Sequence, residues 1–319
     1  MLLAAQLSDI SYAFLGLLLE GLPFIFLGTL VSGFMDVYLP SGWLDRVLPK
    51  NRWSAVALSG LLGFVMPVCE CAVVPVIRRL LRKGLPLSCA VAYMLAAPIF
   101  NPITLLSTFK AFENYTPDGW QLAFSRIFLG YVTAVLVGWV VMKLRASFVL
   151  KKKVLGEVLA GQGTGFGEET RAAASVALEK ENRTILAMRT ALRDFLETAL
   201  YFTVGVFLAA VFIVRVAPGD LEGLAAQEMV STAALMALSY VLSLCSTSDA
   251  FFIAALPTFT LSARMAFLVF GPMLDLKLTF LYLSVFRPKF VFGLGLGLFL
   301  LAGGLSLWWF EFVTIDGMR

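Results

Sequence analysis

Long apolar stretches follow one another along this chain, separated by short polar segments, a pattern that predicts membrane-spanning helices. A helix needs about 20 apolar residues to cross the hydrocarbon core of a bilayer. On that length we expect about eight spans, or about eight to ten if broken or re-entrant helices are counted. The expected spans lie near residues 11–35, 53–77, 85–109, 121–143, 194–214, 228–255, 262–285 and 289–310. The predicted fold class is an all-α polytopic membrane protein.

One long polar stretch divides the apolar spans into two blocks. We expect residues 146–192 to form a cytoplasmic linker, helical around residues 171–193, between a first transmembrane half (1–145) and a second (193–319). Lys and Arg in short loops favour the cytoplasmic side. A basic turn follows the second span, and with this turn and the linker inside, we expect both termini to be cytoplasmic. The turn contains Arg78, Arg79, Arg82 and Lys83.

The composition agrees with a membrane protein and excludes several kinds of chemistry. Hydrophobic residues make up 60% of the 319 residues and charged residues 14%, against about 45–50% and about 25% in soluble domains. The absence of histidine excludes histidine zinc sites, Ser-His and Cys-His catalytic pairs and imidazole relays. Four cysteines are too few for a secreted disulfide framework, and no P-loop is present. We therefore expect no cofactor, no nucleic-acid partner and no enzyme activity.

The two blocks resemble each other, which predicts an internal repeat. Matching positions are separated by an offset that falls slowly from 177 to 174 residues, as small loop deletions would produce. Four spans per half would give parallel repeats, whereas an odd number would give inverted ones. The matched pairs include Glu20 with Glu197, Gly28 with Gly205, Cys69 with Cys245, Pro98 with Pro272 and Asn101 with Asp275.

Charged side chains inside the expected spans are the first candidates for a transport role. A carboxylate in hydrocarbon is costly and normally faces a partner or a water-filled path. We interpret Glu70, Asp249 and Asp275 as candidates for proton coupling. The alternative for Asp275 is a neutralising pair with Lys277. The remaining such residues, Glu20 and Glu197, have an interfacial role as an equal alternative.

The segment PVCECAVVP, residues 67–75, carries the strongest candidate site. On a regular helix, Cys69 and Cys71 would lie about 200° apart around the axis. In an extended segment, which the flanking prolines favour, both would point to one side. A lone buried cysteine is usually a small core hydrophobe, and we interpret Cys89 in that way.

Three further segments extend this candidate site. LSLCSTSDA, residues 242–250, adds Cys245, Ser246 and Ser248, and AAPIFNP adds Pro98 and Asn101. GPMLD, residues 271–275, matches AAPIFNP in the second half. Proline within a span frees backbone carbonyls, and broken helices of this kind line transporter binding sites. Sulfur, carboxylate and backbone groups together favour a soft cation or a thiophilic metalloid over Mg²⁺ or Ca²⁺.

The run from Pro67 to Leu106, with CSTSDAFFIA and FGPMLDLK in the second half, resembles the bacterial YraQ/ArsP-type permeases. The resemblance covers both halves. It implies a multi-pass protein of the bacterial inner membrane that exports trivalent methyl and aromatic arsenicals. On the matching positions it implies Cys69, Cys71 and Cys245 as the metalloid ligands. From the segments themselves we add Glu70, Pro98, Asn101, Ser246 and Ser248 to the expected substrate site.

Three functions remain open from the sequence. The first is proton-coupled efflux of trivalent organoarsenicals bound by cysteine thiolates. The second is a permease for a soft metal ion such as Cu(I) or Hg(II), with Met66, Met94 and Met273 as possible thioether ligands. The third is a membrane thiol-disulfide enzyme that uses the Cys-x-Cys pair. We expect a small-molecule substrate and the lipid bilayer as partners, and a homo-oligomer is a further possibility.

Overall fold

The computed structural model describes residues 2–38, 48–49, 51–65, 68–113, 119–161, 183–214 and 227–317. Its secondary structure there is helical, apart from one isolated antiparallel bridge between Leu150 and Phe286. The prediction of an all-α membrane protein is therefore confirmed.

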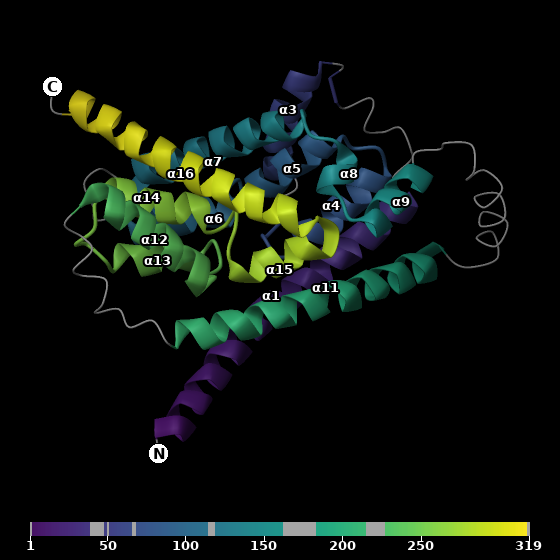
Figure 1. Ribbon diagram of the computed structural model, residues 1–319, viewed down its shortest axis with the longest axis horizontal. Helices are drawn as coiled ribbons and strands as arrows, with labels where there is room; N and C mark the ends of the chain where they lie inside the picture. The colour runs from purple at the N-terminus through teal and green to yellow at the C-terminus, as the bar shows by residue number, and fades with distance from the viewer. Residues whose placement is uncertain are drawn as a thin grey trace.

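Within the described residues, four helices are long and apolar enough to cross a membrane (Figure 1). Their apolar stretches, 8–34, 119–141, 187–213 and 288–310, agree with four of the expected spans. The helices are α1 (Leu2–Tyr38), α7 (Gly119–Val141), α11 (Arg183–Ile213) and α16 (Pro288–Gly317).

The other four expected spans are not continuous helices. Each is divided into two shorter helices, and the described residues between the helices of a pair are 68–72, 97–101, 243–247 and 271–275. In the first half the short helices are α3 (Arg52–Val65), α4 (Val73–Arg82), α5 (Leu87–Ala96) and α6 (Pro102–Ala111). In the second half they are α12 (Glu228–Leu242), α13 (Ser248–Ala254), α14 (Leu261–Phe270) and α15 (Leu276–Val285).

Local chemistry explains where the short helices begin and end. Ser243 ends α12 in a left-handed conformation, with φ of 49°. The side chain of Asn101 accepts a hydrogen bond from the Ile103 N–H and caps α6, and Asp275 accepts one from the Leu278 N–H and caps α15. Proline and the capping residues therefore act as breaks in spans that apolar content alone predicts as continuous.

Part of the expected linker is structured. Two helices, α8 (Ala146–Val149) and α9 (Lys152–Gly161), follow α7, and residues 183–192 belong to α11. Of the helix predicted around residues 171–193, residues 171–182 lie outside the described part of the chain.

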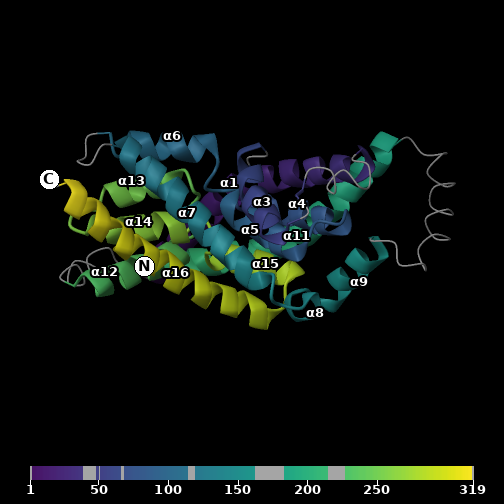
Figure 2. The ribbon, with the colours of Figure 1, turned by 90° about the horizontal axis from the view of Figure 1, so that it is seen from above.

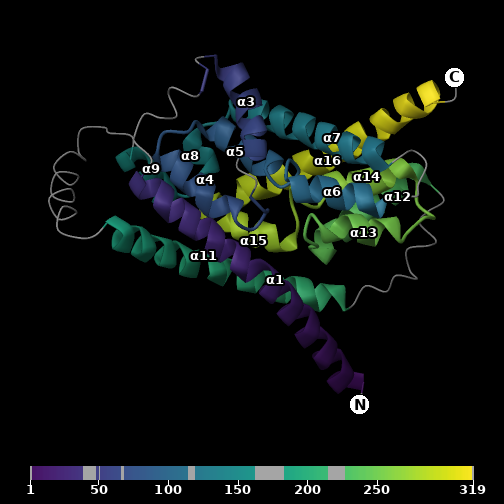
Figure 3. The same ribbon diagram turned by 180° about the vertical axis from the view of Figure 1, so that it is seen from behind.

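The two long helices α1 and α11 pack side by side in opposite directions (Figures 1 and 3). Phe14 of α1 meets Phe207 of α11 at 6.1 Å between ring centroids, and Phe26 meets Phe195 at 5.5 Å. The residue number rises along α1 as it falls along α11, which makes the pair antiparallel.

The helices α7 and α16 are antiparallel as well. Near the end of α16, Trp309 Nε1 donates a hydrogen bond to Ser125 Oγ, 3.1 Å away near the start of α7. At the other end, the bridge between Leu150 and Phe286 holds the start of α16 beside the segment that follows α7.

The two chain ends lie at the end of the molecule opposite to α9 and the start of α11 (Figures 1 and 2). The expectation that both termini are cytoplasmic assumed an even number of full crossings in each half. The breaks replace full spans with pairs of short helices, so that count does not carry the expectation.

Glycine at position 205 allows α11 to lie directly on α15. A Cβ at this position would come 2.8 Å from Lys277 Cα and 3.0 Å from its carbonyl oxygen. We expect Gly205→Val to destabilise the protein by about 1–3 kcal/mol, because the backbone of α15 cannot move aside as a flexible side chain would. Thermal unfolding in detergent measures this effect. Gly16→Val on α1, where a Cβ meets nothing within 4 Å, is the matched control and should unfold like the parent. Equal stability of both variants would contradict the close approach.

Candidate functional site

The two cysteine-containing breaks have the same backbone geometry. The carbonyl oxygen of Cys69 accepts hydrogen bonds from the N–H groups of Ala72 (3.1 Å) and Val73 (3.2 Å). The carbonyl oxygen of Cys245 likewise accepts them from Ser248 (2.9 Å) and Asp249 (3.0 Å). Each cysteine therefore opens a tight turn that leads into a short helix. The segment around Cys69 is unwound as expected, but it is a turn rather than an extended strand.

Three cysteines line one cavity between the two halves. Cys69 and Cys71 come from the first break and Cys245 from the second, and all four cysteines of the chain are free thiols. The cavity has a volume of about 10 Å³, about the room that one water molecule needs. The long helices α1 and α11 cover it with Leu17, Glu20, Gly21, Phe24 and Phe202, and Glu70 and Lys277 complete its lining.

Lys277 pairs with two acidic side chains at this cavity. Its Nζ lies 3.5 Å from Glu70 Oε1 and 3.6 Å from Asp275 Oδ2, and it donates a 2.9 Å hydrogen bond to the Ser243 carbonyl oxygen. The neutralising pair of Asp275 with Lys277 is present, and proton coupling by Asp275 stays a prediction. The same lysine links Asp275 to Glu70.

A chain of polar groups runs from the cavity into the protein. Ser246 Oγ donates to Glu70 Oε2 at 3.3 Å and accepts from Thr104 Oγ1 at 3.3 Å. Thr108 Oγ1 donates to the Thr104 carbonyl oxygen at 2.8 Å. Glu70 is therefore connected with α6 through residues of both halves.

An ion pair continues this chain. Arg126 on α7 donates to Thr108 Oγ1 at 2.8 Å and to Asp249 Oδ2 at 2.6 Å. The side chains of Arg126 and Asp249 are 1% and 3% exposed. Asp249 Oδ1 is buried without a hydrogen-bond partner among the described residues, so this carboxylate keeps one unused acceptor.

Several predicted site residues lie away from the cavity lining. The carbonyl oxygen of Pro98 accepts a 3.2 Å hydrogen bond from Thr104, and Asn101 serves as a helix cap. Ser248 is exposed at the start of α13. Cys89 is buried on α5 and does not line the cavity. Glu197, expected at an interface, pairs with Arg78 and Lys153 near one end of the molecule.

Sequence reasoning missed Arg126 and passed over Lys277 as a site residue. Arg126 lies near the start of a predicted span, where a basic side chain is easily taken as interfacial. The i,i+2 spacing of Asp275 and Lys277 does not suggest a contact on a regular helix. In the structure Asp275 precedes α15 as its cap, so the helical spacing does not apply.

Thiols, carboxylates and a lysine meet at the breaks of short helices inside a multi-pass membrane protein, which is an arrangement typical of transporters. Within the described residues, no group of three thiol or carboxylate side chains is placed to hold a metal ion.

Comparison with known proteins identifies the class more closely. A family model described as a predicted permease, ArsP_1, matches residues 6–304, and the chain belongs to this family. The UPF0718 protein YcgR of Bacillus subtilis is 35% identical over 281 residues, which cover 88% of this chain and 89% of that protein.

Two further relatives are similar to this chain. A protein of Streptococcus mutans, described as a putative two-component membrane permease complex subunit, is 32% identical over 87% of each chain. The UPF0718 protein YraQ of Escherichia coli is 29% identical over 117 residues, 37% of this chain and 32% of that protein. No solved structure matches the chain significantly.

Proposed function

We propose that this permease exports trivalent organoarsenicals, with methyl or aromatic substituents, across the bacterial inner membrane. The observation that carries the proposal is the cavity at which Cys69 and Cys71 of one half meet Cys245 of the other. A monosubstituted arsenical has two exchangeable positions, so two thiolates suffice to hold it. Sulfur ligands favour such a thiophilic centre over hard cations.

Binding proceeds by ligand exchange at arsenic. Each cysteine Sγ forms an As–S bond as an As–OH bond breaks, and the thiol proton leaves with the hydroxide as water. Two exchanges therefore yield two waters, and attack by water on the outer side reverses both steps. Of the three proposed proton-coupling residues, Glu70 lines the cavity, and we infer that its carboxylate passes the thiol proton to the departing hydroxide. Glu70 and Asp275 share Lys277 as a partner, whereas Asp249 pairs with Arg126.

We propose further that the two halves are an inverted repeat. The antiparallel pairs α1 with α11 and α7 with α16 support this arrangement, as do the matching turns at Cys69 and Cys245. The second half then begins with α11 at Arg183 rather than at residue 193. Residues between α7 and α11 form the linker.

The distribution of basic residues supports one orientation of the chain across the membrane. Basic residues gather where α4 ends, along α9 and at the start of α11, which favours the cytoplasm for this end of the molecule. The beginning of α1 and the end of α16 then lie on the outer side. Homo-oligomerisation stays a prediction.

Uptake into everted membrane vesicles tests the function. We expect vesicles that contain the protein to accumulate phenylarsonous acid, and collapse of the proton gradient to reduce the accumulation severalfold. Parallel uptake assays with Cu(I) and Hg(II) test the soft-metal alternative. Vesicles that accumulate either ion but do not accumulate phenylarsonous acid would contradict the proposal. Vesicles from cells that do not produce the protein serve as the blank.

A further inference from the structure

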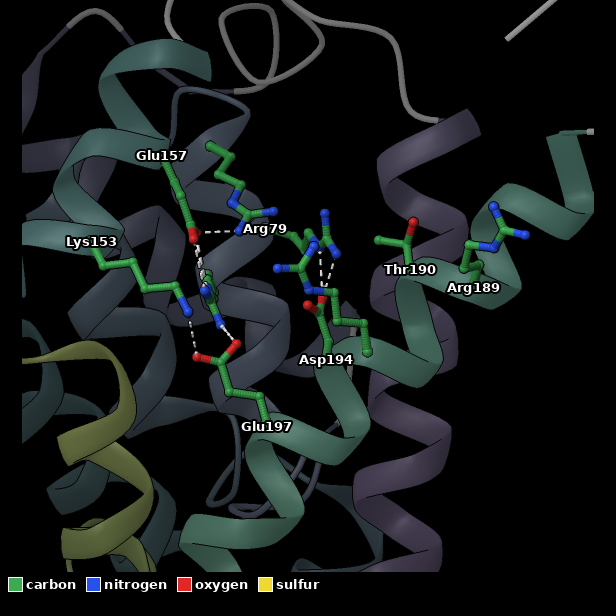
Figure 4. Close-up of a pocket in the computed structure, with 10 residues that line it drawn as sticks. Arg79, Lys153, Glu157, Arg189, Thr190, Asp194 and Glu197 are labelled. Carbon is green, nitrogen blue, oxygen red and sulfur yellow. Dashed lines mark hydrogen bonds and ion pairs between the residues drawn. The ribbon is translucent and has the colours of Figure 1, made fainter. Parts of the chain in front are cut away.

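A second cavity, of about 460 Å³, lies between α4, α9 and α11 at the end of the molecule away from the chain termini (Figure 4). It is separate from the cysteine cavity and shares no lining residue with it. Its lining consists of Arg78, Arg79, Arg82, Lys153, Glu157, Arg189, Thr190, Arg193, Asp194 and Glu197.

Ion pairs organise the inner wall of this basic pocket. Arg78 joins Glu157 at 3.0 Å to Glu197 at 2.9 Å, and Lys153 also binds Glu197, at 3.1 Å. Arg79 pairs with Asp194, and Arg82 pairs with Glu157. Burial disfavours the charged form of Glu157, but hydrogen bonds from the two arginines outweigh burial and hold its pKa below the usual value. The carboxylates of the wall are thus matched by its own cations.

The lining carries an excess of positive charge. Among the described residues of this lining, six side chains are basic and three are acidic, and the four cations of the inner wall contact all three of these carboxylates. Arg189 and Arg193 are the other two basic side chains of the lining. A pocket with such an excess attracts an anion that carries one or two negative charges.

The outward face of α11 beside this pocket is apolar. Leu192, Leu196, Leu200 and Val204 are each half exposed or more, at helical spacing. At 100° per residue, Arg189 and Arg193 emerge on the same side of the helix as these side chains. Figure 4 shows Arg189 directed away from Asp194, toward the outside of α11. Two arginines therefore border a surface that suits acyl chains.

The length of α11 places these arginines near the membrane surface. The helix has 31 residues, about 46 Å, whereas the hydrocarbon core is about 30 Å thick. Its first turns therefore extend to the level of the phosphate groups. At that level arginine side chains reach lipid phosphates while their stems stay beside acyl chains.

We propose that the basic pocket binds the phosphate of an anionic phospholipid, whose acyl chains lie along the apolar face of α11. The charge excess selects an anion, and the adjacent apolar face selects a lipid over a soluble phosphate compound. Because α4 begins at Val73, two positions after Cys71, a bound headgroup also steadies the helix that leads from the cysteine turn.

Native mass spectrometry of the detergent-purified full chain tests this site. Dihexanoyl phosphatidylglycerol should bind at least about tenfold more tightly than dihexanoyl phosphatidylcholine or inorganic phosphate. The double variant Arg189→Gln/Arg193→Gln should lose about thirtyfold in affinity for phosphatidylglycerol, since each arginine near anionic lipid contributes about fivefold.

Lys110→Gln is the matched control, because this exposed lysine lies on α6, far along the chain from the pocket. It should bind phosphatidylglycerol like the parent. Thermal unfolding without lipid verifies that the double variant is folded. We expect it to fold, because both replaced arginines are exposed. Equal binding of both lipids, equal binding of inorganic phosphate, or unchanged affinity in the folded double variant would each overturn the proposal.

Discussion

Replacing Cys245 with serine is expected to weaken the binding of phenylarsonous acid to the purified protein by at least about a hundredfold. The two halves each bring a thiol to the cavity, so the second As–S bond forms within a complex that the first has already made. Such an intramolecular step raises affinity by about 10² to 10⁴ over a single contact. The serine hydroxyl fills nearly the same space but does not replace the thiolate as a soft ligand.

Isothermal titration with each single variant measures this loss and identifies the partner of Cys245. If Cys69 is that partner, Cys69→Ser should match Cys245→Ser, and Cys71→Ser should lose much less. Cys89→Ser is the matched control, because Cys89 is a buried free thiol that lies outside the cavity. Tight binding by the Cys69→Ser/Cys245→Ser protein would falsify the thiol mechanism. An equal loss of binding in Cys89→Ser would indicate that serine substitution disturbs the protein as a whole and does not remove a ligand.

Breaking the ion pair between Arg126 and Asp249 is expected to destabilise the protein by about 3–5 kcal/mol. Arg126→Met leaves a carboxylate buried at the interface of α7 and α13, where one of its oxygens already lacks a hydrogen-bond donor among the described residues. The unfolding midpoint in detergent should fall by on the order of 10 °C. The double variant Arg126→Met/Asp249→Asn should recover much of this loss, because it leaves no unpaired charge.

The control for this pair is Lys110 with Glu113. These side chains are 61% and 47% exposed, and exposed pairs contribute about 1 kcal/mol or less. Lys110→Met should therefore unfold almost like the parent. If Arg126→Met behaved like Lys110→Met, or if the double variant were no more stable than either single one, the buried pair would not have the role that its geometry suggests.

Apolar length predicted the long helices well and the short ones poorly. Four runs of more than 20 apolar residues became α1, α7, α11 and α16. In the other runs, a hydropathy pattern does not register a left-handed residue such as Ser243 or a cap such as Asp275, because each break involves only a few residues. These breaks decide the number of crossings, which is why apolar length alone does not give the side of the termini.

The cysteines of the site could be found from the sequence, but its cations could not. Cys69, Cys71 and Cys245 stand out by type and by repeat position. The contacts of Lys277 with Glu70 and of Arg126 with Asp249 join residues more than 100 positions apart. The spacing of residues along the sequence does not predict such pairs, because they depend on how the two halves face each other.

The small size of the cysteine cavity bears on how the protein works. Benzene needs an apolar cavity of about 150 Å³, whereas this one has about 10 Å³. The cavity in this structure is therefore too small for an aromatic molecule. Phe24 of α1 and Phe202 of α11 line it beside the thiols, so the proposed function requires these two antiparallel helices to separate before an aromatic arsenical reaches the cysteines. An inhibitor wedged between them would stop the transport cycle without touching sulfur.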